Sequence, residues 1–279
     1  MTDTGNRVTI RAAIAAAAAR FGFSETSRLD AELLMAHALG TSREAMLLAR
    51  LNDPAPDGFA ALVERRAAHE PVAYITGIRD FWTISLAVGP GVLIPRADSE
   101  TLLEAAVDHF RGTPGPATIL DLGTGPGTLL FAALAEWPGA RGLGIDASEQ
   151  ALEFAALNAR RLGLEGRARL ERGDWFAGRD ARFDLVLCNP PYVETDAPLS
   201  AEVRDWEPAA ALFAGAEGLD DYRRLAPQIA TALVPGGLAC VEIGAEQAAA
   251  VGALFREAGL RVSTRHDLAG RQRCVVVTP

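Results

Sequence analysis

Four consecutive residues, Asn189, Pro190, Pro191 and Tyr192, follow directly after the apolar run FDLVLC. Two successive prolines remove two backbone donors and fix two φ angles, and a residue that precedes a proline is held in extended geometry. The carbonyl oxygens of this corner and the side-chain amide of Asn189 are therefore left free to bind another molecule. Such oxygens can accept the two N–H bonds of a planar amine or amide nitrogen.

Methyl transfer to an amide nitrogen needs a site of this kind, because the delocalised lone pair makes the nitrogen a poor nucleophile. The side-chain oxygen of Asn189 and the carbonyl of Pro190 would fix the nitrogen, while Tyr192 would pack against the flat substrate group. Positioning and desolvation can supply much of the rate enhancement, and the proton can leave after the nitrogen has become cationic. We therefore interpret Asn189, Pro190 and Tyr192 as catalytic residues.

A second candidate site is the glycine-rich stretch ILDLGTGPGT. Asp121 ends a short apolar run, and Gly123, Gly125 and Gly127 follow within one turn. Glycine lets a ligand approach the backbone closely, and ligands in such folds bind beyond the carboxyl ends of the strands. Asp146 ends the next predicted strand, and its carboxylate can accept from two ribose hydroxyls. The GxGxG spacing favours S-adenosylmethionine over NAD, but a dinucleotide enzyme uses the same acidic position, so both cofactors stay open here.

The segment GDWF follows the third predicted strand and contributes Asp174 and Trp175. Trp175 could cover the face of an adenine while Asp174 accepts from its exocyclic amine, and Trp175 could equally fill the core of a loop. The three cysteines and four histidines show no metal-type spacing. We therefore expect no metal ion.

The composition limits the classes of partner. The chain has 279 residues, a net charge of −9 and a pI of about 5.0, which argues against a standing electrostatic grip on nucleic acid or an anionic membrane. The scattered cysteines suggest a reducing compartment. The first residues do not read as a signal peptide, and no apolar run has the length of a membrane span. We expect a cytoplasmic protein without stable nucleic-acid binding or membrane attachment.

Residues 1–75 read as a helical bundle, which we interpret as a substrate-recognition domain. In the predicted helix SRLDAELLMAHALG, we expect Ser27 to be the N-cap, with Asp30 completing a capping-box variant. Leu29, Leu33, Leu34 and Ala38 have the spacing of one face.

Residues 76–97 predict a β-hairpin-like linker, and residues 98–279 alternate between strands and helices. This alternation indicates a parallel sheet with right-handed crossovers. The last two strands are joined by a short connection, so one strand must be antiparallel. The expected fold class is α/β: a Rossmann-like, mostly parallel sheet with one antiparallel strand and a small N-terminal helical bundle.

Nearly the whole chain resembles the release-factor N5-glutamine methyltransferases, which modify the Gly-Gly-Gln loop of class I peptide chain release factors. The matching stretches are, in order, RLDAELLMAHALG, EPVAYITGIRDFW, LIPRADSE, ILDLGTGPG, GID, GDWF, NPPYV, EPAAALFAGAEGL and DLAGRQR. Asn-Pro-Pro-Tyr alone is shared with adenine and cytosine amino-methyltransferases. The helical N-terminal segment and PVAYITG make the match narrow.

The resemblance implies a class I methyltransferase sheet, S-adenosylmethionine as cofactor, S-adenosylhomocysteine as product, no metal, and a release factor as protein partner. It implies cofactor contacts at Gly123, Thr124, Gly125, Pro126, Gly127, Asp146, Trp175 and Asn189. It implies substrate contacts at Asn189, Pro190, Pro191 and Tyr192.

One stretch departs from the family, since PRADSE stands where the family usually reads Pro-Arg-Pro-Asp-Thr-Glu. We expect Ala97 to loosen that turn and Ser99 to keep the hydroxyl, with a local change in the site wall and no loss of activity. Arg96 and Glu207 are expected near the entrance of the site.

Four other functions compete with this interpretation. A nucleic-acid amino-methyltransferase would flip a base into the same cradle, but the acidic charge balance and the missing basic recognition segment count against it. A sister enzyme that methylates a ribosomal-protein glutamine differs only through the N-terminal segment. An NAD-dependent oxidoreductase leaves Asn189 to Tyr192 unexplained. A non-catalytic scaffold leaves the intact glycine turn and Asp146 unexplained.

Overall fold

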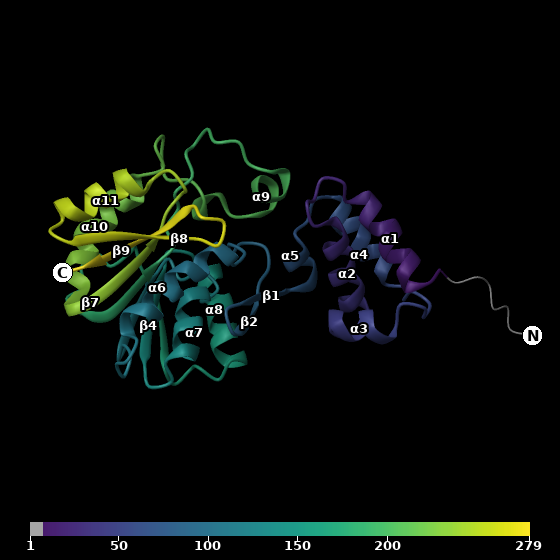
Figure 1. Cartoon of the computed structure of the whole chain (residues 1–279), viewed down its shortest axis with the longest axis horizontal. Helices are drawn as coiled ribbons and strands as arrows, with labels where there is room; N and C mark the ends of the chain where they lie inside the picture. The colour runs from purple at the N-terminus through teal and green to yellow at the C-terminus, as the bar shows by residue number, and fades with distance from the viewer. Residues whose placement is uncertain (1–7) are drawn as a thin grey trace, which may run out of the picture. The chain divides into compact units, whose positions relative to one another are not determined.

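The computed structural model describes residues 8–279, which form two compact units (Figure 1). One unit contains the chain up to Gly77 together with Ser200–Trp206. The other contains Ile78–Leu199 and Glu207–Pro279.

The first unit is a bundle of short helices around an apolar core. Its helices are α1 (Ile10–Arg20), α2 (Ser27–Ala38), α3 (Arg43–Ala49), α4 (Phe59–Ala67), α5 (Val72–Thr76) and α9 (Ala201–Trp206). The first five of these contribute buried side chains to its centre, among them Ile10, Ile14, Leu34, Met35, Met46, Val63 and Ile75. Helix α9 belongs to this unit although its sequence lies within the range 98–279, and there Glu202 pairs with Arg66 at 2.7 Å.

The start of α2 differs from the sequence prediction. The N-cap is Thr26, without a side-chain capping bond, and Ser27 is the first helical residue. Asp30 is buried and accepts from the Arg66 guanidinium at 2.8 and 3.0 Å instead of capping the helix. Of the predicted apolar face, Leu34 is fully buried and Ala38 is half-buried, whereas Leu29 and Leu33 are 39% and 36% exposed, so the face is only partly buried. The capping-box prediction is therefore wrong, because an ion pair within the bundle takes the carboxylate.

The second unit begins with an antiparallel hairpin of β1 (Ile78–Phe81) and β2 (Ile84–Ala87). The chain then runs through a 3-10 turn, η1 (Ala97–Ser99), into helix α6 (Glu100–Phe110).

A seven-stranded sheet with the order β5-β4-β3-β6-β7-β9-β8 forms the centre of this unit. Its strands are β3 (Thr118–Leu122), β4 (Arg141–Asp146), β5 (Ala168–Arg172), β6 (Phe183–Cys188), β7 (Leu233–Glu242), β8 (Arg261–His266) and β9 (Gln272–Thr278). Strand β9 pairs antiparallel with both β7 and β8, and the other pairs are parallel. The mostly parallel sheet with one antiparallel strand is thus confirmed.

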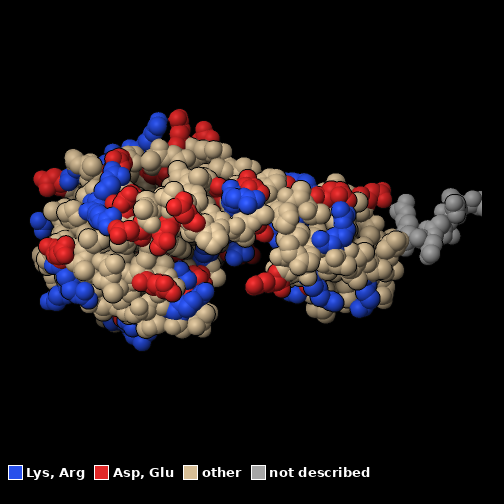
Figure 2. Space-filling model, turned by 90° about the horizontal axis from the view of Figure 1, so that it is seen from above, with Lys and Arg blue, Asp and Glu red and all other residues tan. Residues whose placement is uncertain are grey.

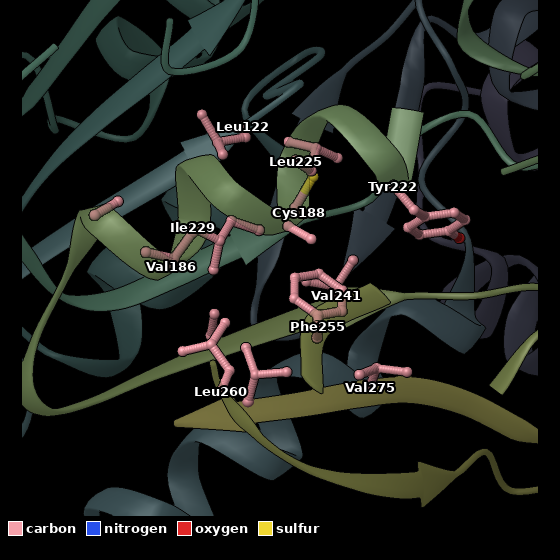
Figure 3. Close-up of a cluster of buried hydrophobic side chains, with 14 of the residues drawn as sticks. Leu122, Val186, Cys188, Tyr222, Leu225, Ile229, Val241, Phe255, Leu260 and Val275 are labelled. Carbon is pink, nitrogen blue, oxygen red and sulfur yellow. The ribbon is translucent and has the colours of Figure 1, made fainter. Parts of the chain in front are cut away.

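Helices cover both faces of the sheet. On one face lie α6, α7 (Thr128–Glu136) and α8 (Glu149–Arg161), and on the other lie α10 (Asp220–Ala232) and α11 (Ala248–Glu257) (Figure 1). Figure 3 shows side chains of α10 and α11, such as Leu225, Ile229 and Phe255, against Val241 and Val275 of the strands. Strands buried on both faces need near-continuous apolar runs, which is why FDLVLC has so few polar residues.

The order of the strands creates a crevice at the carboxyl ends of the central strands. The chain moves outward from β3 through β4 to β5, and then returns to place β6 on the other side of β3. In such sheets a ligand binds beyond the carboxyl ends of the strands where the order reverses. The glycine turn follows β3 and Asn189 follows β6, so both sequence motifs lie at this point.

All 27 basic residues of the chain are arginines. On the face that Figure 2 shows, their side chains are intermixed with those of Asp and Glu. Within residues 8–279, no helix combines the length and the apolar character that crossing a membrane requires.

Candidate active site

The glycine turn and the Asn-Pro-Pro-Tyr corner lie side by side. Strands β3 and β6 are parallel neighbours, with Leu122 opposite Cys188. The residue after each strand therefore falls at the same level, and a Cβ built on Gly123 would lie 3.8 Å from the carbonyl oxygen of Asn189. The two motifs that the sequence analysis treated separately form one site.

The turn after β3 requires its glycines. Gly123, Gly125 and Gly127 have φ of 70°, 56° and 90°, a region that residues with a side chain rarely adopt. A Cβ at Gly127 would lie 1.9 Å from the ring of Phe131, and one at Gly123 would lie 3.2 Å from the indole of Trp175. The turn is thus tightly packed and leaves its backbone open to a ligand beside Gly123 and Gly125.

The buried side-chain amide of Asn158 stabilises this turn. Asn158 of α8 donates to the carbonyl of Pro126 at 2.9 Å and to the carbonyl of Ala87 at 3.0 Å. Its Oδ1 accepts from the Ala87 amide at 2.7 Å. Asn158 is fully buried, and these hydrogen bonds connect the end of strand β2 to the glycine turn.

Asp121, at the end of β3, has one oxygen in use and one free. Its Oδ2 accepts from the Thr124 hydroxyl at 2.6 Å and from the Leu130 amide at 3.1 Å. Its Oδ1 is buried and has no partner among the described residues. Burial raises the pKa of this carboxyl to about 7. Asp121 lines a cavity of about 40 Å³ that Arg96 and Ser99 also line, so the free oxygen suits a donor from a bound molecule.

Asp146, at the end of β4, is oriented by its own loop. The amides of Gly125 and Ser148 donate to its two carboxylate oxygens, each at 2.8 Å. Burial raises the pKa of Asp146 above its ordinary value. Each oxygen keeps lone-pair capacity for a further donor, because an ionised carboxylate accepts about four hydrogen bonds in all.

A cavity of about 460 Å³ lies at the carboxyl ends of the strands, within the range of sizes that bind small molecules and cofactors. Six of the predicted site residues line it: Gly123, Gly125, Asp146, Trp175, Asn189 and Pro191. Two further predicted residues, Thr124 and Pro126, line the small cavity next to Asp121. Three line neither cavity, namely Gly127, Pro190 and Tyr192.

Two residues of the cavity wall come from α10 and could not be predicted from the sequence. Trp175 donates through Nε1 to Asp221 at 3.1 Å, and Asp174 pairs with Arg224 at 2.5 Å. Asp221 and Arg224 both line the large cavity. No motif marks them, since an acidic residue in the first turn of a helix is ordinary and only the tertiary fold brings it to the indole.

The Asn-Pro-Pro-Tyr corner contains two oxygens that accept no hydrogen bond from the described residues, on Asn189, which lines both cavities, and on the buried Pro190. Asn189 donates through Nδ2 to the hydroxyl of Ser99 at 3.3 Å. Within the described residues, no donor reaches Asn189 Oδ1 or the carbonyl of Pro190. The corner is held by its backbone, since the amides of Tyr192 and Val193 donate to the Leu212 carbonyl at 3.1 and 2.8 Å.

Tyr192 is fixed through both its side chain and its backbone. Its hydroxyl donates to the Glu242 carboxylate at 3.2 Å, and its backbone carbonyl accepts from Gln247 at 3.0 Å. Burial raises the pKa of the Tyr192 hydroxyl, so that it remains a protonated donor.

Arg96 and Glu207, which the sequence analysis placed near the entrance, form a pair. Arg96 donates to the buried Glu207 carboxylate at 2.5 Å, and the Ile94 amide donates to it at 3.3 Å. Glu207 therefore ties down the loop before η1, and Arg96 faces the small cavity beside Asp121.

A parallel sheet with a glycine turn after β3, a carboxylate after β4 and Asn-Pro-Pro-Tyr after β6 defines a class I S-adenosylmethionine-dependent methyltransferase. Known families agree, since residues 116–251 match the family described as methyltransferase domain and residues 12–77 match the PrmC N-terminal domain. The fold is also similar to that of a 16S rRNA N2 G1207 methyltransferase from Thermus thermophilus, solved with AdoMet and guanosine. The TM-score is 0.51 at 19% identity, over 72% of this chain and 49% of that one.

Relatives of known name narrow the class. The chain is 45% identical over 258 residues to the release factor glutamine methyltransferase of Rhodospirillum rubrum, covering 90% of this chain and 79% of the relative. It is also 45% identical over 274 residues to the enzyme of the same name from Cereibacter sphaeroides, covering 95% of each. The chain belongs to the release factor glutamine methyltransferase family, which confirms the resemblance found in the sequence.

No group of three or more His, Cys, Asp or Glu side chains within residues 8–279 is arranged to hold a metal ion.

Proposed function

We propose that this enzyme transfers a methyl group from S-adenosylmethionine to the side-chain N5 nitrogen of the glutamine in the Gly-Gly-Gln motif of class I peptide chain release factors. The observation that carries the proposal is the corner at Asn189 and Pro190. It offers two acceptor oxygens, free of donors from the described protein, next to a cavity of cofactor size. A primary amide has two N–H bonds, which match these two acceptors.

The cavity wall offers both polar and aromatic groups that can bind the parts of S-adenosylmethionine. The Asp146 carboxylate can accept from the two hydroxyls of a ribose, and the Trp175 indole offers an edge or face to the adenine. The free Oδ1 of Asp121 suits the ammonium group of a methionine moiety. The contacts that we propose for the cofactor are Gly123, Thr124, Gly125, Pro126, Gly127, Asp146, Trp175 and Asn189. When bound, S-adenosylmethionine supplies a methyl group on a sulfonium sulfur and becomes S-adenosylhomocysteine, so no metal ion is required.

The role that we propose for Asn189 and Pro190 is to bind and turn the substrate amide. Oδ1 of Asn189 and the carbonyl of Pro190 accept its two N–H bonds, which aims the lone pair of the nitrogen away from both acceptors. As the nitrogen becomes cationic, its N–H groups become stronger donors, so both bonds are stronger in the transition state than in the ground state. Pro191 and Tyr192 complete the wall against which the flat amide packs. The excess proton leaves after methyl transfer.

The helical unit, for which the sequence predicted the range 1–75, is proposed to grip the release factor while its loop enters the site. The proposal places the enzyme in the cytoplasm, where release factors act in translation.

The test is methyl transfer to a purified class I release factor. The enzyme is incubated with labelled S-adenosylmethionine and the release factor, and the digested factor is sequenced by mass spectrometry. We expect one methyl group, on the glutamine of the Gly-Gly-Gln motif, and none when that glutamine is replaced by alanine. Parallel reactions contain DNA, RNA and ribosomal proteins. Methylation of one of these, with none on the release factor, would overturn the proposal.

A further inference from the structure

A buried polar chain lies behind the Asn-Pro-Pro-Tyr corner. Asn189 donates through Nδ2 to Ser99 Oγ at 3.3 Å, and the Ser99 hydroxyl donates to Oε2 of Glu242. The hydroxyl of Tyr192 donates to Oε1 of the same carboxylate at 3.2 Å. Ser99 is 2% exposed and Glu242 is fully buried, so water does not compete for these bonds. Ser99 comes from η1 and Glu242 from the end of β7.

The chemistry of the three groups fixes which group donates and which accepts in each of these hydrogen bonds. An ionised carboxylate only accepts, and a serine hydroxyl has a single hydrogen to donate. The hydrogen of Ser99 therefore points to Glu242, and the lone pairs that remain on Ser99 can only accept from Asn189. The amide of Asn189 must then turn its NH₂ group toward Ser99, which leaves its Oδ1 on the opposite side.

The direction of the Asn189 amide decides whether the corner can bind a primary amide. The two ends of an asparagine amide have nearly the same shape, so only hydrogen-bond partners distinguish the two orientations. A flipped Asn189 would present its NH₂ to the N–H groups of the substrate glutamine, and two donors would face each other.

We propose that Glu242, acting through Ser99, is a positioning residue that holds the Asn189 side chain with its oxygen toward the substrate amide. This inference rests on the proposed function and extends it by two residues that touch neither the reacting nitrogen nor the methyl group.

The charge on Glu242 sets the strength of this constraint. Burial raises the pKa of Glu242 to about 7, while the bonds from Ser99 and Tyr192 and the guanidinium of Arg273 favour the ionised form. A protonated Glu242 could donate to Ser99, which would free the Ser99 hydrogen to point to Asn189 and would remove the preference between the two orientations. The polar and titratable groups that face Glu242 come from η1, β6 and the loop after it, α10 and β9: Asp98, Ser99, Cys188, Tyr192, Tyr222, Arg273 and Cys274.

Tyr222 provides a matched control for Ser99. The hydroxyl of Tyr222 donates to the backbone carbonyl of Glu242 at 2.8 Å and is as deeply buried as the carboxylate. Tyr222→Phe deletes one hydroxyl next to Glu242, as Ser99→Ala does. It leaves intact the hydrogen bonds that link Glu242 through Ser99 to Asn189.

The experiment measures kcat with a purified release factor, and the affinity for S-adenosylhomocysteine, in wild type, Ser99→Ala, Ser99→Thr and Tyr222→Phe. We expect Ser99→Ala to lower kcat roughly 10- to 100-fold, the loss typical of a misplaced substrate group. Cofactor affinity should change by no more than about threefold, since the lost interaction acts on the substrate. Ser99→Thr restores the hydroxyl and should recover most of kcat, and Tyr222→Phe should keep it.

The outcomes separate this inference from the proposed function. A wild-type enzyme that methylates no release factor refutes the proposed function. An active wild type with an unchanged kcat in Ser99→Ala overturns the positioning role, as does a loss that Ser99→Thr does not repair.

A second variant carries the test if Ser99→Ala does not bind the cofactor. Glu242→Gln keeps the shape, and its amide can satisfy Ser99 with either a donor or an acceptor. We expect a lower kcat above the wild-type pKa of about 7 and no dependence of kcat on pH across that value. A kcat in this variant equal to that of wild type above that pH would overturn the inference.

Discussion

The hydroxyl of Ser99 donates to the carboxylate of Glu242, two residues that are 143 positions apart in the chain. Through Asn189, this bond connects the turn before α6 to the corner after β6. One of the two acceptors that we propose for the substrate amide, Oδ1 of Asn189, therefore depends on a buried carboxylate at the end of a third element, β7.

Tyr192→Phe removes the second hydrogen bond to the Glu242 carboxylate and keeps the aromatic ring that we propose packs against the substrate. Because the bond from Tyr192 lowers the pKa of Glu242, its loss should raise that pKa above the wild-type value of about 7. In the plot of kcat against pH, the rise on the acidic side should therefore move to higher pH. On the alkaline plateau, kcat should fall by less than it does in Ser99→Ala. The pH dependence of kcat at saturating substrates checks this. A rise that stays in place or moves to lower pH would show that Glu242 is not the group that titrates.

Asp146→Asn should weaken cofactor binding and leave kcat at saturating cofactor largely unchanged. A hydrogen bond to a charged group contributes about 1.5–3 kcal/mol, so the dissociation constant of S-adenosylhomocysteine should rise roughly 10- to 100-fold. Isothermal titration calorimetry measures it. Asp174→Asn is the comparison, because this exposed carboxylate lines the same cavity and is already paired with Arg224. A larger loss in Asp174→Asn than in Asp146→Asn would contradict the assignment of the ribose to Asp146.

The contributions of Asp121 and Glu242 to the stability of the protein should fall as the pH rises from about 4 to about 7. Burial raises the pKa of Asp121 from 3.8 to about 7 and that of Glu242 from 4.5 to about 7. The folded state then binds more protons than the unfolded state within this window, so each group opposes folding increasingly as the pH rises through it. The full effect is present above the folded pKa and amounts to a few kcal/mol for each group.

Asp121→Asn tests this linkage. The variant cannot ionise at that position, so its free energy of unfolding in urea should depend less on pH between about 4 and about 7 than that of wild type. Equal slopes in wild type and variant would show that Asp121 is not held with a raised pKa.

The fold could be predicted from the sequence because its signals are local. Apolar runs such as FDLVLC and the glycine turn after Asp121 determine strands and a close backbone approach without reference to distant residues. The start of α2 could not be predicted in the same way. Asp30 has the spacing of a capping residue, but Arg66, 36 positions further on, takes its carboxylate.

The residues that support the site could not be predicted because they depend on the pairing of strands. Glu242 interrupts an ordinary apolar run, LACVEIG, and nothing in that run points to Asn189. In the sheet, Val241 lies opposite Cys188, which brings Glu242 to the level of Asn189. Asp221 reaches Trp175 for a similar reason, through the packing of α10 against the sheet. The roles of the predicted site residues themselves stay predictions until the reaction is measured.

The most direct test of the account is the effect of Asn189→Ala on methyl transfer and on cofactor binding, measured side by side. Single-turnover transfer to the release-factor glutamine gives the first quantity, and titration with S-adenosylhomocysteine gives the second. The account predicts that the transfer rate falls by roughly 100-fold or more while cofactor affinity changes by far less, because Oδ1 of Asn189 holds the substrate amide. A variant that transfers methyl groups at the wild-type rate, or that loses only its affinity for the cofactor, would contradict it.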